Sequence, residues 1–227
     1  MLVAILTGAL LLAQQQQPPP PPDPALLPVA DTPGLPRILL IGDSISIGYT
    51  LGVRAKLAGK ANVHRILENA GPTINGTGKI EQWLGNDTRP WDLVHVNFGL
   101  HDLKRDDGLN RQVSTEDYER NLRDIIRKVK ARSRHVIWAS TTPVPEGKVS
   151  PHRVPADVAI YNAIAAKVMH DEQIPINDLY AFSLPHLATW QRPVNVHFVE
   201  AGYDALATQV AAIVAKTLQL KIQPELR

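Results

Sequence analysis

Cysteine is absent from this chain of 227 residues, which excludes disulfide frameworks, cysteine zinc sites and thiol nucleophiles. Aromatic residues make up only 5% of the sequence, no run of Lys and Arg is longer than two residues, and the formal net charge is +2. Surfaces that bind nucleic acids combine basic clusters with aromatic side chains. The composition therefore indicates that nucleic acid is not a partner.

No apolar run approaches the roughly 20 residues of a membrane-spanning helix. Residues 2–13 are apolar over a length typical of a signal-peptide core, and a glutamine tract and a proline-rich stretch follow them. We expect residues 1–17 to comprise a signal peptide with its glutamine tract, so that the protein is exported. We expect residues 18–36 to form a spacer of polyproline-II type outside the fold, and residues 37–222 to form the folded domain.

From Arg37 onward, short apolar runs alternate with amphipathic segments. An alternation of strands and helices predicts an α/β fold, a three-layer sandwich with a doubly wound parallel sheet. A proline in the fifth run makes it an edge-like strand. The pattern predicts strands over residues 37–41, 63–67, 93–98, 135–139 and 174–176, and helices over residues 48–58, 79–84, 114–132, 157–172 and 201–220.

Residues suited to acyl transfer follow the predicted strands. Ser44 follows the first strand, Gly71 the second and His101 the third, while His197 precedes the last helix. The carboxyl ends of parallel strands meet at one edge of a sheet, where ligands bind. A hydroxyl, an amide, a ring donor and a basic histidine are the groups that acyl transfer needs.

At these blocks the chain resembles the SGNH/GDSL hydrolase family, over residues 37–220. Gly42-Asp43-Ser44 matches the nucleophile block, Gly71 the second-block glycine, and Gly99-Leu100-His101-Asp102 the third block, with His101 in place of the family's asparagine. His197 matches the catalytic histidine. The resemblance implies a flavodoxin-like sandwich and a serine ester hydrolase that needs no cofactor or metal, acting on a small-molecule or carbohydrate ester, often an acetyl ester.

The same resemblance assigns a role to each residue. Ser44 is the expected nucleophile and His197 the expected base, while the amides of Ser44 and Gly71 and the ring N–H of His101 form the expected oxyanion hole. The family's acid, three residues before the histidine, is replaced by Val194. A base histidine needs an acceptor that fixes its tautomer. Either Asn195 or a backbone carbonyl near Val194 can fill that role, and both predict a modest turnover.

Other interpretations remain open at this stage. Ser44 can be only a helix N-cap, His101 can be purely structural, and His197 can merely pack beneath Phe198. His101, Asp102 and His197 together have the ligand types of a metal site, although without helical spacing. The whole chain can be an inactive relative that binds an acylated glycan, or a flavodoxin-like domain for a phosphorylated ligand. We expect the loops over residues 104–113 and 143–155 to line the site and set its substrate.

Overall fold

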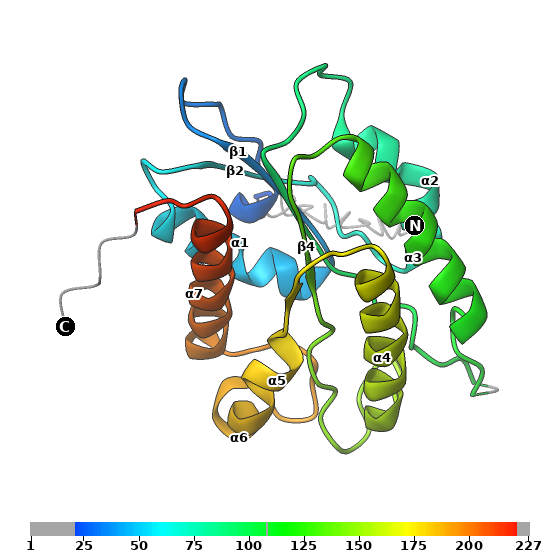
Figure 1. Cartoon of the computed structure of the whole chain (residues 1–227). Coiled ribbons are helices and arrows are strands. Elements are labelled where there is room, and N and C mark those ends of the chain that lie inside the picture. The colour runs from blue at the N-terminus through cyan, green and yellow to red at the C-terminus, as the bar shows by residue number, and fades with distance from the viewer. Residues whose placement is uncertain (1–20, 108, 222–227) are drawn as a thin grey trace, which may run out of the picture.

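The apolar runs of the sequence form one parallel sheet in the computed structural model, which describes residues 21–107 and 109–221 (Figure 1). Within those residues the sheet has five strands in the order β2-β1-β3-β4-β5. Leu39 in β1 pairs with His64 on one side and with Val94 on the other. The strands are β1 (Arg37–Ile41), β2 (Asn62–Arg65), β3 (Leu93–Val96), β4 (Val136–Ala139) and β5 (Ile176–Asn177).

Helices cover both faces of the sheet, which confirms the predicted three-layer α/β sandwich. α1 (Ser44–Lys56) packs against α7 (Glu200–Thr217) on one face, and α2 (Thr73–Leu84), α3 (Thr115–Ala131) and α4 (Pro155–Asp171) cover the other (Figure 1). Shorter elements complete the fold: α5 (Leu179–Ser183), α6 (Leu187–Trp190) and the 3₁₀ turns η1 (Pro24–Leu26) and η2 (Leu184–His186).

The predicted starts of two helices, at residues 48 and 79, are wrong. α1 begins at Ser44 because the Asp43 carboxylate caps it, accepting the N–H of Ile45 at 2.9 Å. α2 begins at Thr73, and its glycines hide the helical pattern of its first turns. One of them, Gly76, packs so closely on Ile125 and Phe98 that a side chain would not fit there. Tertiary packing thus outweighs the low helix propensity of glycine.

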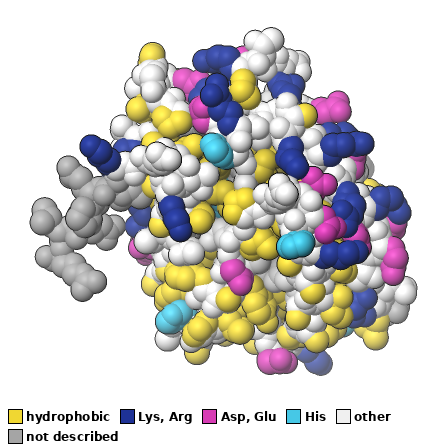
Figure 2. Space-filling model, viewed as in Figure 1, with side chains coloured by type: hydrophobic (Ala, Val, Ile, Leu, Met, Phe, Trp, Pro, Cys, Tyr) yellow, Lys and Arg dark blue, Asp and Glu magenta, His cyan; other side chains and the backbone are white. Residues whose placement is uncertain are grey.

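Figure 2 shows charged side chains of both signs over α3 and hydrophobic side chains over α4 to α6. On α3, Arg123 forms an ion pair with Glu119 at 2.7 Å, and Arg127 forms one with Asp124 at 2.6 Å. On the opposite side of α3, apolar side chains such as that of Leu122 are fully buried. This helix therefore follows the amphipathic pattern that the sequence predicts.

Part of the proline-rich segment folds against the domain, which differs from the expected spacer over residues 18–36. Ala25 in η1 is buried, and the Arg54 guanidinium of α1 donates to the carbonyls of Pro24 and Leu27, both at 3.2 Å. Thr32 and Asn62 exchange two hydrogen bonds of 2.8 and 3.0 Å. These polar contacts from α1 and β2 satisfy backbone groups that a proline-rich chain cannot pair within itself. Residues 1–17, the expected signal peptide, lie outside the described residues.

No helix within residues 21–107 and 109–221 is long and apolar enough to cross a bilayer.

Glycines bring α1 and α7 into close contact. A Cβ atom at Gly52 would lie 2.6 Å from the Cβ of Ala207, and one at Gly48 would lie 2.1 Å from the ring of Tyr203. Both separations are far below van der Waals contact, so neither position accepts a side chain without movement. The backbone of α1 therefore packs directly against the side chains of Tyr203 and Ala207 of α7.

We expect Gly52→Ala to destabilise the protein by about 1–2 kcal/mol in urea unfolding. Overpacking costs about 1–3 kcal/mol and exceeds the gain in helix propensity of at most about 1 kcal/mol. Gly78→Ala in α2 is the matched control, because a Cβ there meets nothing within 4 Å. It should leave stability unchanged or raise it. Equal stability of Gly52→Ala and the wild type would contradict the close contact.

Candidate active site

Ser44 and His197 meet at the carboxyl edge of the sheet, although 153 residues separate them in the sequence. Ser44 follows β1 as the first residue of α1, and His197 lies shortly before α7. The Ser44 hydroxyl and His197 Nε2 are 2.9 Å apart. Because Asp43 supplies the N-terminal cap of α1, the interpretation of Ser44 as only a helix cap is wrong. A hydroxyl in direct contact with an imidazole is the arrangement of an activated nucleophile.

Asn195 orients the His197 ring. Its Oδ1 lies 2.7 Å from His197 Nδ1 and also accepts the backbone N–H of His197 at 2.9 Å. An amide oxygen only accepts, so Nδ1 carries the ring proton and Nε2 is left as the acceptor for Ser44. The sequence left open whether Asn195 or a backbone carbonyl near Val194 orients the histidine. In the structure the side chain of Asn195 faces Nδ1.

Val194 points away from this pair. Its φ of 49° is left-handed, a strained conformation for a β-branched residue, and its side chain is 47% exposed. The turn that causes this is tight, because Arg192 N–H donates to the His197 carbonyl at 2.9 Å and Asn195 N–H to the Arg192 carbonyl at 3.2 Å. The turn therefore aims residue 195, one position later than the family's acid, at the histidine.

Burial lowers the pKa of His197 below its ordinary value of 6.5. The Asp43 carboxylate opposes this shift, while the Arg192 and Arg153 guanidinium groups add to it. The ring is therefore neutral at neutral pH and able to accept the proton of Ser44.

Two backbone amides were expected to act with Ser44. The Ser44 N–H lies in the first turn of α1, where an N–H has no acceptor within the helix. The Gly71 N–H donates to Asn69 Oδ1 at 2.9 Å, so binding an oxyanion requires the exchange of that hydrogen bond. Gly71 has a φ of 66°, and a Cβ there would lie 2.5 Å from Asn75 Nδ2. Only glycine fits this turn.

His101 lies in the turn after β3, and its Nδ1 is 2.9 Å from Lys104 Nζ. Burial lowers the pKa of His101 to about 4, and the cations Lys104 and Arg153 and the ring of His197 lower it further, against Asp43. These electrostatic interactions place His101 in the same polar cluster as the Ser44–His197 pair. The ring is neutral throughout the neutral pH range.

Asp102 does not join the two histidines. Its buried Oδ1 accepts from Thr73 twice, from the backbone N–H at 2.8 Å and from the hydroxyl at 2.5 Å. Burial raises the pKa of Asp102 to about 7. The proposed metal set of His101, Asp102 and His197 is therefore not assembled, and no group of three or more potential ligands occurs in the described part of the chain. Asp102 instead fastens the His101 turn to the start of α2.

Arg65 supports the nucleophile turn, and the sequence analysis missed it. Its buried guanidinium donates to the carbonyls of Gly42 at 2.8 Å and Asp43 at 3.2 Å, and also to those of Ile66 at 2.9 Å and Glu68 at 2.8 Å. It thus joins the loop before Ser44 to the loop that leads to Gly71. A charged residue at the end of a buried strand was the available signal, since such a charge needs partners.

The two loops expected to line the site are fastened to each other, because the Arg105 N–H donates to the His152 carbonyl at 2.9 Å. Asp157 in the first turn of α4 accepts from Arg105 and Arg111, each at a closest distance of 2.7 Å. Buried Arg153 donates to the Leu100 carbonyl at 2.7 Å. Gln191 ties the second loop to the His197 turn, because its side-chain amide donates to the carbonyls of Pro143 and Val196. The second loop is therefore held against Leu100 and the His197 turn, and the first loop against α4.

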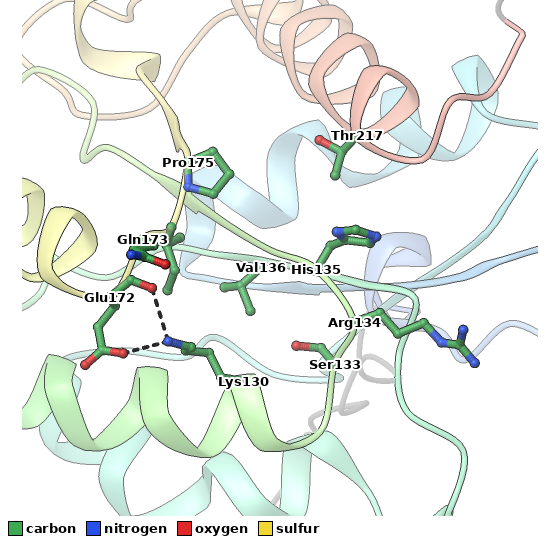
Figure 3. Close-up of a pocket in the computed structure, with 10 residues that line it drawn as sticks. Lys130, Ser133, Arg134, His135, Val136, Glu172, Gln173, Pro175 and Thr217 are labelled. Carbon is green, nitrogen blue, oxygen red and sulfur yellow. Dashed lines mark hydrogen bonds and ion pairs between the residues drawn. The ribbon is translucent and has the colours of Figure 1, made fainter.

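Two cavities are lined by neither Ser44 nor His197. One of about 360 Å³ lies beside the second loop and is lined by prolines and by Tyr180, Leu184 and Leu187. The other, of about 260 Å³, lies at the amino end of β4 (Figure 3). Within it Lys130 Nζ donates to the Glu172 carboxylate at 2.8 Å. Its place at the opposite edge of the sheet separates it from the candidate site.

We expect the pKa of His197, measured by NMR titration, to lie below 6.5 in the wild type. In Asn195→Asp a carboxylate replaces the amide beside Nδ1 and favours the imidazolium, so the pKa should rise by about 1–3 pH units. Asn86→Asp adds the same charge at an exposed position and should leave the pKa unchanged. An unchanged pKa in Asn195→Asp would contradict the contact between these residues.

Comparisons with known proteins give one match to a family and several matches in fold. The sequence model of the GDSL-like lipase/acylhydrolase family matches residues 40–205. A comparison with curated proteins gives no match.

Solved structures share the fold. A lipase/acylhydrolase from Enterococcus faecalis has a TM-score of 0.70 at 20% identity, covering 84% of this chain and 100% of its own. The acetyl xylan esterase AlAXEase has a TM-score of 0.66 at 16% identity, covering 78% and 99%. An acetyl xylan esterase from Geobacillus stearothermophilus has a TM-score of 0.61 at 17% identity, covering 84% and 97%.

Proposed function

The chain belongs to the GDSL-like lipase/acylhydrolase family and is a carboxylic ester hydrolase, and on that premise we propose that Ser44 is its nucleophile. The hydrogen-bonded chain from Ser44 through His197 to Asn195 carries the proposal. Its three members have the relative positions that a nucleophile, a base and the group orienting that base require.

In the first half of the reaction, Ser44 Oγ attacks the ester carbonyl while His197 Nε2 takes the hydroxyl proton. The negative charge moves to the carbonyl oxygen, where the Ser44 N–H, the Gly71 N–H and a ring N–H of His101 stabilise it. His197 then protonates the leaving alcohol as the carbon–oxygen bond breaks, which leaves the acyl group on Ser44. Water, activated in the same way, attacks the acyl-serine and releases the acid.

A neutral Asn195 limits the rate of both the acylation of Ser44 and the hydrolysis of the acyl-serine. It fixes the tautomer of His197 but carries no negative charge to stabilise the imidazolium that forms. This predicts turnover below that of an otherwise equal site with a carboxylate at the same position.

We propose a short acyl group, such as acetyl, on a carbohydrate as the substrate. The carbohydrate part is suggested by the acetyl xylan esterases that share this fold. We propose in addition that residues 1–17 direct export, which would bring the enzyme to polymeric esters outside the cell.

A second candidate function is binding of an acylated glycan without turnover. The hydrogen bond from Gly71 N–H to Asn69 favours it, because it occupies one of the expected oxyanion donors. The two functions differ in whether an acyl-serine forms, so one labelling experiment separates them.

We expect Ser44→Ala to lose at least about 10³-fold in hydrolysis of p-nitrophenyl acetate, because no other hydroxyl contacts His197 in the described structure. A fluorophosphonate probe should add its mass to the peptide that contains Ser44. Ser46→Ala, which removes a buried hydroxyl from the same helix, should retain both hydrolysis and labelling. Full activity in Ser44→Ala, or labelling of another serine, would overturn the assignment. A wild type that neither hydrolyses esters nor reacts with the probe would favour binding without turnover.

We expect His101→Ala to lower kcat by about 10²–10³-fold with little change in KM, because one donor to the oxyanion is removed. His101→Asn, which restores an N–H donor, should recover part of the loss. Steady-state kinetics on the same ester measure both values. Near-normal kcat in His101→Ala would show that the ring is structural and that the backbone amides suffice.

A further inference from the structure

A lysine faces the one residue of the proposed oxyanion hole that departs from the family's pattern. His101 stands where the family has an asparagine, and its Nδ1 lies 2.9 Å from Lys104 Nζ. No described residue contacts His101 Nε2 within hydrogen-bond distance. The ring is therefore fixed on one side and open on the other.

Replacing asparagine by histidine creates a problem that asparagine does not have. An amide nitrogen always donates, whereas a neutral imidazole donates from only one of its two nitrogens. Only the tautomer with its proton on Nε2 presents a donor at the open side of the ring. A site built on histidine thus needs a group that selects this tautomer.

We propose that Lys104 is a positioning residue that selects the Nε2–H tautomer of His101 and so makes this ring a donor to the oxyanion. The proposal rests on the function proposed above. An ammonium group has three N–H donors and no acceptor, so the nitrogen that faces it must be unprotonated. Nδ1 therefore accepts from Lys104, and the ring proton resides on Nε2.

The backbone holds Lys104 in place for this role. Its N–H donates to the His101 carbonyl at 3.3 Å, and its own carbonyl accepts from Gln112 N–H at 2.7 Å. The next residue, Arg105, is anchored on Asp157 of α4 at 2.7 Å. The backbone of the lysine is therefore already fixed, so that its contact with the ring costs side-chain entropy alone.

Burial keeps His101 neutral, so its tautomer decides whether it donates. The groups that face it are Asp43 before α1, Lys104 in its own loop, Arg153 in the loop before α4 and His197 before α7. The last three oppose a positive charge on the ring and Asp43 favours it, while burial lowers the pKa to about 4. Loss of the Lys104 charge should raise this pKa.

The first test is spectroscopic and independent of catalysis. Long-range ¹H–¹⁵N spectra of the imidazole rings, with His101→Asn to assign the signals, should show His101 of the wild type as the Nε2–H tautomer at pH 7. Lys104→Met removes the donor while keeping a side chain of similar length. It should give a mixture of tautomers and a higher pKa, and Lys104→Arg should retain the wild-type tautomer.

The second test is a double-mutant cycle on ester hydrolysis. Lys104→Met should lower kcat roughly tenfold with little change in KM, a part of the 10²–10³ that a lost oxyanion donor costs. In the His101→Asn background, the same change should alter kcat less than about twofold, because an amide has no tautomer to select. Lys130→Met, which removes a paired lysine at the opposite edge of the sheet, should leave kcat unchanged.

The outcomes separate this inference from the proposed function. An Nδ1–H tautomer in the wild type, or an equal loss of kcat in both backgrounds, overturns the role of Lys104 even if Ser44 proves to be the nucleophile. The role of Lys104 is also overturned if the wild type has only the Nε2–H tautomer of His101 but Lys104→Met leaves kcat unchanged. If Ser44→Ala retains full activity, the proposed function fails. The spectra still decide which tautomer of His101 Lys104 selects.

Discussion

The close contact between the glycines of α1 and the side chains of α7 sets the distance on which the site depends. Ser44 begins α1 and His197 lies three residues before α7, so the separation of the two helices becomes the separation of hydroxyl and imidazole. Gly48 and Gly52 let the helices approach to where any side chain would collide with Tyr203 or Ala207. The remaining fastenings act locally, since Arg65 holds the turn before α1 and the side chain of Asn195 holds the ring of His197. The close packing of α1 on α7 at Gly48 and Gly52 therefore fixes how near Ser44 lies to His197.

The charges around the site favour one half of the transition state over the other. Acyl transfer creates a negative oxyanion and a positive imidazolium within a few ångströms of each other. Lys104, Arg153 and Arg192 are cations that act on the two histidines, whereas Asp43 is the anion that opposes them. Because Asn195 beside His197 is neutral, these cations stabilise the oxyanion and disfavour the imidazolium. The replacement of the acid and the gathering of cations thus act in the same direction.

The fold, and the meeting of Ser44 and His197 at one edge of the sheet, could be predicted from the sequence, because both follow from the order of its local patterns. Buried strands read as apolar runs, and Ser44, Gly71, His101 and His197 follow or precede predicted elements in a recognisable order. The roles of Arg65, Asp102 and Lys104 could not be predicted in this way, because each depends on contacts set by loop conformation. The choice of Asn195 over a backbone carbonyl depends likewise on the left-handed turn at Val194. Periodicity in a sequence describes which side of an element is buried, and not where a loop directs a polar side chain.

The folded proline-rich segment has a consequence for how the protein behaves in a crowded solution. β2 is an outer strand of the sheet, and an outer strand presents unpaired backbone groups that can join a strand of another molecule. Asp31 accepts from the side chain of His64 on this strand at 2.6 Å, and Thr32 exchanges two hydrogen bonds with the side chain of Asn62. Proline lacks the donor that a growing β-ladder needs, so a segment rich in it does not itself extend the sheet. Residues 23–36 therefore hold on to the polar side chains of this outer strand, and a chain shortened to the family domain alone would lose these contacts at a border that can pair with another molecule.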